Sequence, residues 1–162
     1  MRLKLCAQVF MLMINIQELT QVTLQGEVWR QIPDYPYLVS NLGRVYGTEK
    51  NHIEKGYTIK TGYRIAELYK DGQRKRFKVS HLVAAAFCKN YDPTKHVHHI
   101  NRKRNDDRAV NLLPCTPAEH KAIHALYNAL FNNIPLLAEL LTPIIHCNIN
   151  LLFDDTKGGD VA

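Results

Sequence analysis

The sequence has little of what defines several common protein classes. Its 162 residues include four cysteines, and none of them forms a Cys-x-x-Cys pair. This argues against a zinc ribbon and against a secreted disulfide framework, so a reducing compartment is the simpler interpretation. No segment approaches the roughly 18 continuous apolar residues of a membrane-spanning helix. With 46% hydrophobic and 22% charged residues, the composition is typical of a folded globular chain, either one domain or a small module with appendages.

The first residues, "MRLKLCAQVFMLMI", place an apolar run after basic residues, as a signal peptide does. The run is short, Gln8 interrupts it, and no small-x-small cleavage site follows before Thr23. The sequence therefore favours a cytoplasmic protein over a secreted one.

Positive charge is concentrated in the middle of the chain. Residues 42–108 contain sixteen Lys and Arg against seven Asp and Glu, whereas residues 1–41 are balanced and residues 109–162 have a net charge of −3. A basic stretch of this kind is expected on a surface that faces phosphates. The alternative is a solvated basic face without a partner.

The first half of the chain is predicted to form short strands. The stretches "YLVS" and "RVYG" flank a turn at Asn41-Leu42-Gly43, and residues 56–80 continue as strands separated by Thr61-Gly62 and Asp71-Gly72. Asp-Gly tolerates the positive φ angles of a type I′ turn, so it predicts a tight hairpin. Ala-rich residues 81–88 are predicted to form a short helix with Ser80 as its N-cap.

Residues 95–124 are predicted to form a ββα unit. A strand near residues 96–100 and a strand near residues 112–115 enclose a polar loop. The following helix is expected to have Thr116 as its N-cap, Pro117 at its first position and Glu119 in its first turn. Beyond this unit an apolar segment is predicted to be helical, broken at Pro135 and Pro143, and to cover the module or a partner chain.

Histidine is unusually dense in this unit, since five of the eight histidines lie between His96 and His124. His120 and His124 are four residues apart on the expected helix, so they share one face and can bind one ion. His98 or His99 is the candidate third ligand. Neighbours on a regular strand point to opposite faces. We therefore expect the strand to give way to the loop near Asn101-Arg102, so that His98, His99 and His120 bring their ring nitrogens into one small cleft.

Taken alone, a His-x-x-x-His pair is a weak signal, and surface coincidence is the usual explanation. The adjacent His98 and His99 can have different roles, in which one binds the ion and the other stays free to act as a base near neutral pH. Loop residues Arg102, Lys103 and Arg104 would then hold backbone phosphates. His81 and His96 are expected to be structural or solvent-facing. Cys88 and Cys115 are expected to behave as buried apolar residues.

The segment "VHHINRKRNDDRAVNLLPCTPAEHKAIH" resembles the HNH endonuclease motif of the ββα-metal nucleases. The preceding "EVWRQIPDYPYLVSNLGRVY" and "GYRIAELYKDGQRKRFKVSHLVAAAFC" resemble the NUMOD-like module that is joined to HNH in phage and intron-encoded homing endonucleases. Together the resemblance covers about residues 27–124.

This resemblance implies a role for each matching residue. It implies that His98, His120 and His124 are the metal ligands and that His99 is the general base. Asn111 is implied to be the central residue that pins the loop. Two departures are present. The loop "INRKRNDD" lacks the common Asp-Gly step, and "LLPCT" replaces a frequent Leu-x-Trp-x-Thr, which removes a packing aromatic but no catalytic group.

The fold class implied is α+β, with a small antiparallel β module, a ββα-metal unit and a C-terminal helical extension. The expected divisions are residues 1–26, 27–90, 91–128 and 129–162. The expected function is a homing or nicking endonuclease acting on double-stranded DNA with Mg²⁺ or Mn²⁺, although three histidines also suit Zn²⁺ or Ni²⁺. The alternative is a non-catalytic DNA-binding module that keeps the scaffold. A monomer is slightly favoured. The hairpin residues expected to contact DNA, unless they form only a solvated face, are Arg74, Lys75, Arg76 and Lys78.

Overall fold

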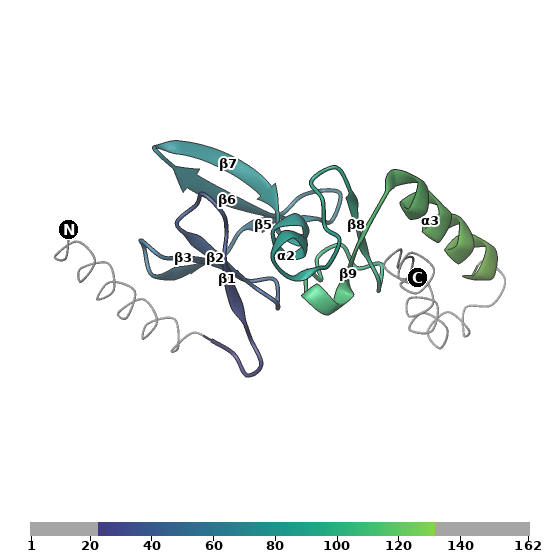
Figure 1. The fold of residues 1–162 in the computed structure, drawn as a ribbon, viewed down its shortest axis with the longest axis horizontal. Helices are drawn as coiled ribbons and strands as arrows, with labels where there is room; N and C mark the ends of the chain where they lie inside the picture. Colours follow the sequence, from purple (N-terminus) through teal and green to yellow (C-terminus); the bar gives the residue numbers. More distant parts are fainter. Residues whose placement is uncertain (1–22, 132–162) are drawn as a thin grey trace, which may run out of the picture.

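The computed structural model describes residues 23–131, and these form an α+β fold with antiparallel sheets. Figure 1 shows the β-rich part at one end, helix α2 in the middle, and the β8–β9 ribbon with helix α3 at the other end. The expected α+β class is confirmed. Within the described residues, no helix is both long and apolar enough to cross a bilayer.

The first sheet has four antiparallel strands in the order β1-β2-β3-β4, namely β1 (Trp29–Gln31), β2 (Tyr37–Ser40), β3 (Val45–Gly47) and β4 (His52–Glu54). The turn after β2 forms as expected, because the Ser40 hydroxyl accepts hydrogen bonds from the backbone N–H groups of Leu42 and Arg44. Gly43 takes the left-handed conformation in this turn, with φ of 79°.

The second sheet contains β5 (Tyr57–Thr58), β6 (Arg64–Lys70) and β7 (Gln73–Lys78). Lys70 pairs with Gln73, so a two-residue turn joins β6 to β7. Its residues Asp71 and Gly72 have φ angles of 51° and 74°. Positive values at both positions are those of a type I′ turn, which confirms the hairpin prediction.

Helix α2 (Val79–Phe87) follows β7 directly. The prediction that Ser80 caps this helix is wrong, because the helix begins two residues before the predicted start and its N-cap, Lys78, makes no side-chain capping bond. Ser80 is instead fully buried inside the first turn. Val79, at the first helical position, is buried, and its apolar packing outweighs the capping preference of a serine.

The predicted ββα unit is confirmed, with β8 (His96–His99), a 3-10 turn at Ala109–Asn111, β9 (Leu112–Cys115) and α3 (Pro117–Phe131). At the start of α3 the Thr116 hydroxyl accepts a bond from the Glu119 backbone N–H at 3.2 Å, and the Glu119 carboxylate accepts one from the Thr116 N–H at 2.6 Å. This reciprocal pair is a capping box. The expected division at residue 128 falls inside α3, and the predicted helix breaks at Pro135 and Pro143 lie outside the described residues.

One hydrophobic core joins the β-rich module to the ββα unit. Buried residues of the module and of α2, including Val39, Leu68 and Val83, pack in the same cluster as Val97 of β8 and Leu112 of β9. A smaller cluster of Cys115, Ile123 and Tyr127 holds α3 against the ribbon. The ribbon is therefore covered by the module on one side and by α3 on the other.

Gly43 lies at a close approach between the two units. A Cβ atom added to this glycine would lie 3.0 Å from both the Cβ and the carbonyl oxygen of Asp107, in the loop between β8 and β9. The neighbouring Asn41 carbonyl accepts a hydrogen bond from the Ala109 N–H at 2.8 Å. The turn after β2 thus holds the loop of the ββα unit by backbone contacts.

We expect Gly43→Ala to destabilise the fold more than Gly72→Ala. Both glycines have similar positive φ angles, so both substitutions carry a strain of about 1–2 kcal/mol. Only at Gly43 does the added methyl group also meet a neighbour, since the space around Gly72 is open. Overpacking of this kind costs a further ~1–3 kcal/mol. Urea unfolding of both variants measures the difference, and equal losses would show that the Gly43 contact is not tight.

Candidate functional site

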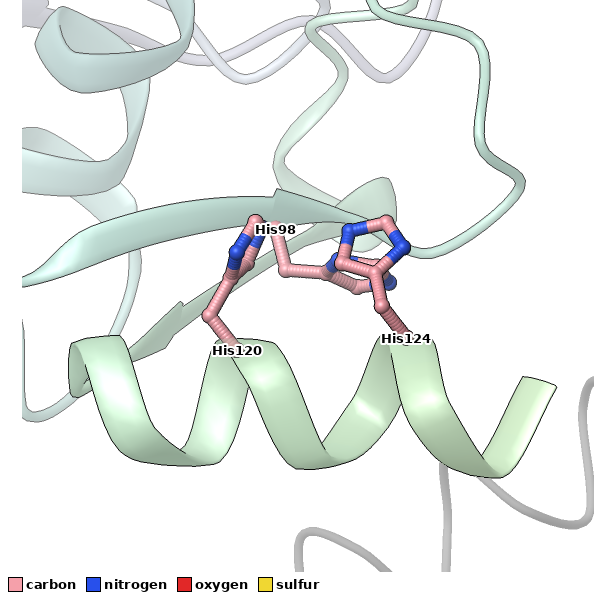
Figure 2. A group of neighbouring side chains, drawn as sticks. All are labelled: His98, His120 and His124. Atoms are coloured by element: carbon pink, nitrogen blue, oxygen red, sulfur yellow. The ribbon is translucent and has the colours of Figure 1, made fainter. Parts of the chain in front are cut away.

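Three histidines meet between β8 and α3. His98 lies on the strand above the helix, and His120 and His124 point up to it from successive turns of α3 (Figure 2). One ring nitrogen from each residue lies within 4.8 Å of the other two. His98 is 2% exposed, so the cluster is anchored on one side in the protein interior. The structure thus brings together the three residues that the sequence proposed as metal ligands.

The donor set suits a divalent ion. Three imidazoles can occupy three coordination positions and leave others open for water or substrate, as catalytic metal sites do. Burial lowers the pKa of His120, and the neighbouring His124, His96 and Arg104 lower it further. A lowered pKa keeps the imidazole neutral to a lower pH, and the neutral form is the one that binds metal. The three histidine side chains are therefore suited to bind a divalent ion.

His96 also approaches the cluster. It lies two residues before His98 on the same face of β8, and its ring centroid is 5.2 Å from that of His120. It is exposed, in agreement with the expected solvent-facing position. Among the described residues, the set whose ring nitrogens lie within 4.8 Å of one another does not include His96.

His99 does not join the cluster. Strand pairing continues through His99, which lies opposite Leu112, so the expectation that a break in β8 turns both rings into one cleft is wrong. Regular alternation sends the His99 ring to the other side of the ribbon. There its Nε2 lies 3.1 Å from the Asp107 carboxylate, and its ring centroid is 5.9 Å from that of Tyr63.

Asn111 holds the loop that follows β8. Its side-chain oxygen accepts the Asn101 backbone N–H at 2.8 Å, and its amide donates to the Asp106 carbonyl at 2.7 Å. Arg102 supplies the turn with a positive φ of 63°. The hydrogen bond from Arg108, with a further one from Asn101, holds the pKa of Asp106 at about 2, so this carboxylate stays charged. The pinned loop is the arrangement that the resemblance implied for Asn111.

The basic residues of this loop flank both histidine positions. Arg102 lies with its guanidinium carbon 5.7 Å from the ring centre of Tyr127, which stacks on His98. Arg104 lies 5.2 Å from the ring centre of Tyr63, beside His99. Lys103, between them, is exposed. The loop thus presents positive charge toward the cluster and toward His99.

The basic residues of the β6–β7 hairpin differ in the side chains that they contact. Arg74 and Arg76 both pair with Glu67 on the neighbouring strand, at 3.2 Å and 3.0 Å. Lys75 lies over the Phe77 ring. Lys78 lies 4.5 Å from the ring centre of Tyr63, on which Arg104 also rests. Tyr63 therefore links the end of the hairpin to the loop of the ββα unit.

Cys115 is buried as the sequence suggested, whereas Cys88 is only partly buried. Burial raises the pKa of the Cys88 and Cys115 thiols to about 11, so neither is a thiolate ligand at neutral pH. His81 is partly buried in α2, where its Nδ1 lies 3.3 Å from the Tyr91 hydroxyl. Burial lowers its pKa as well, with further contributions from Lys78, His96 and His99.

Sequence reasoning missed Asp107, Tyr63 and Tyr127. Asp107 is separated from His99 by eight positions, and only the folded loop brings them together. Tyr127 is three residues after His124 on α3, so helical spacing was a signal for it. No local pattern identified Tyr63, because its neighbours come from β7 and from the loop after β8.

A ββα unit with three converging histidines is joined to a small antiparallel module, and this arrangement is similar to that of a solved HNH homing endonuclease. The chain is a homologue of HNH endonucleases, and residues 27–72 match the NUMOD4 motif. It is 35% identical over 86 residues to the DNA endonuclease I-HmuI of Bacillus phage SP01, covering 52% of this chain and 49% of that protein.

Two further comparisons agree. An uncharacterised HNH endonuclease of Acanthamoeba polyphaga mimivirus is 33% identical over 131 residues, which are 77% of this chain and 31% of that protein. The solved structure of the HNH homing endonuclease I-HmuI, described for DNA binding and cleavage, matches with a TM-score of 0.58 at 28% identity. This match covers 70% of this chain and 66% of that one. The chain spans about half of the first curated relative and about a third of the second.

We expect the purified protein to bind one transition-metal ion through the cluster, and His120→Ala and His124→Ala to weaken that binding strongly. Co²⁺ titration followed by absorbance, with calorimetry using Ni²⁺, measures the affinity. Binding should weaken in acid, because protons compete for the nitrogen atoms, and the lowered pKa of His120 should shift its part of this loss to lower pH. His52→Ala is the matched control, since His52 lies in β4 beside Glu54. Equal affinity in all variants would refute the site.

Proposed function

We propose that this chain is a metal-dependent HNH endonuclease of the homing or nicking type that hydrolyses double-stranded DNA. One observation carries the proposal: neighbouring residues of β8 supply a ligand to a three-imidazole cluster and a histidine paired with a buried carboxylate. The similarity to I-HmuI, a DNA endonuclease, supports the same activity. We further propose that it acts in the cytoplasm of a phage-infected or element-carrying host cell.

His99 is the proposed general base. Its Nε2 is engaged by Asp107, so Nδ1 is the ring nitrogen left to accept a proton from water. Asn111 holds the loop that begins after His99 and so fixes the surroundings of the base. Removal of the proton from water produces the nucleophile that attacks the phosphorus atom, and the leaving group is the 3′ oxygen.

The ion is proposed to be held by His98, His120 and His124. When bound, a divalent ion would stabilise negative charge on the phosphodiester and on its leaving oxygen from one face of β8, while His99, the next residue along the strand, would activate water from the other face. Mg²⁺ and Mn²⁺ are the ions expected for the class, whereas the all-imidazole donor set favours ions such as Zn²⁺ and Ni²⁺. Activity with each ion distinguishes these candidates.

The DNA backbone is proposed to follow the basic residues from the hairpin to the site. Lys78 and Arg104 share the Tyr63 ring, and Tyr63 lies beside His99, so positive charge is continuous from β7 to the proposed base. Arg102 and Lys103 extend this surface along the loop. Arg74 and Arg76 contribute less net field than free arginines, because Glu67 balances part of their charge.

We expect His99→Ala to lower the rate of plasmid cleavage by about 10²–10⁴, as loss of a positioned base does. DNA binding by gel shift should change little, because the basic surface remains. His98→Ala and His120→Ala should lose metal affinity, so higher Mn²⁺ should restore part of their activity but none in His99→Ala. Asn111→Ala should fall between these, since it disturbs the loop and deletes no reacting group.

Supercoiled plasmid with Mn²⁺ or with EDTA is the assay, and His52→Ala serves as the control with unchanged cleavage. If the wild type binds DNA tightly but cleaves it no faster than His99→Ala at any metal concentration, the endonuclease proposal fails. The alternative, a DNA-binding module that retains the scaffold, then takes its place.

We expect Lys78→Ala to weaken DNA binding and to reduce its salt dependence. The plot of log affinity against log salt concentration has a negative slope, and losing one contact between a cation and a DNA phosphate makes it less steep by about 0.9. The double variant Arg74→Ala/Arg76→Ala should change the slope less per charge removed, because Glu67 already compensates both residues. Gel shifts at several salt concentrations measure the slopes. An unchanged slope for Lys78→Ala would show that this end of the hairpin is a solvated face.

A further inference from the structure

The buried pair formed by His99 and Asp107 is held from the β-rich module. The two side chains are only 4% and 1% exposed. The second carboxylate oxygen of Asp107 lies 3.6 Å from the Arg64 guanidinium, which belongs to β6. Arg64 also donates to the Gly43 carbonyl at 3.0 Å, and Gly43 is the glycine that approaches Asp107. Three segments of the chain thus converge on one carboxylate.

A buried carboxylate beside an imidazole has a defined chemical effect. It accepts the N–H of the ring nitrogen that it faces, so the neutral ring must carry its lone pair on the other nitrogen. It also stabilises the imidazolium that forms when the ring takes a proton. Arg64 supplies partial charge compensation, which a carboxylate with 1% exposure needs.

We propose that Asp107 is a positioning residue for the proposed base His99, and that Arg64 of the β-rich module holds Asp107 in place. This inference rests on the proposed nuclease function. Asp107 fixes Nε2 as the protonated nitrogen of His99 and Nδ1 as the proton acceptor. Asp107 itself does not touch the substrate. The module is then part of the catalytic arrangement as well as a surface for DNA.

Several features separate this role from simple packing. The neighbouring Asp106 carboxylate accepts hydrogen bonds from Arg108 and Asn101, and so it stabilises the loop itself. The Asp107 carboxylate instead faces His99 on one oxygen and Arg64 on the other. The metal cluster lies on the opposite side of β8, so a change at Asp107 should leave metal binding intact.

The decisive measurement is a double-mutant cycle on single-turnover plasmid cleavage with saturating Mn²⁺. Asp107→Asn keeps the side-chain shape but removes the charge that selects the tautomer, and we expect a rate loss of about 10²-fold or more. In the His99→Ala background the same substitution should cause no further loss, because its effect acts through the ring. Gel-shift affinity and Co²⁺ binding should match the wild type. Asp92→Asn, an exposed aspartate in the same unit, is the matched control.

Two outcomes overturn the proposal: an equal loss from Asp107→Asn in both backgrounds, or no loss in either. If Asp107→Asn does not fold, Arg64→Gln replaces it, with a smaller loss that must also vanish in the His99→Ala background. Nitrogen-15 NMR of the wild type gives a readout independent of cleavage, since the His99 ring should carry its proton on Nε2. A wild type that cleaves no DNA refutes the proposed function, whereas a proton on Nδ1 refutes the positioning role.

Discussion

The two-residue periodicity of β8 is the constraint on which the site depends. Because His98 and His99 are neighbours on a regular paired strand, one ring must face α3 and the other must face away from it. The first completes a cluster with His120 and His124, and the second meets Asp107. A shift of the β8–β9 register by one residue would exchange these environments. The backbone pairing, more than any side-chain contact, therefore assigns the two histidines to different chemistry.

That register is held from both ends of the ribbon. Asn111 lies just before β9, and its side chain bonds to backbone groups of the loop that leaves β8. The capping box of Thr116 and Glu119 begins α3 immediately after β9, and so sets which helical face reaches His98. Since His120 and His124 are one turn apart, the position at which the helix starts determines whether both reach the strand.

Local patterns in the sequence were sufficient for the ββα unit and for three of its histidines. Strand length, an Asp-Gly turn, a capped helix and His-x-x-x-His spacing each depend on residues close together in the chain. The start of α2 was not predicted, because packing of Val79 overrides the capping preference of Ser80. The pairing of His99 with Asp107 also could not be predicted, because Asp107 is held by Gly43 and Arg64, which are distant in sequence and meet the loop only in the folded chain.

These long-range contacts bear on how the two parts of the chain cooperate. A two-stranded ribbon is marginal by itself, and the small cluster of Cys115, Ile123 and Tyr127 covers one of its faces. The other face packs through Val97 and Leu112 into the core of the module, with α2 between them. The same side carries His99 and its buried partner. The expected boundary between residues 90 and 91 therefore separates two sequence motifs but not two structural units. The hydrophobic core and the surroundings of the proposed base are formed by residues from both sides of this boundary. The precision of the site therefore depends on the β-rich module, although the NUMOD4 motif within it ends well before the histidines.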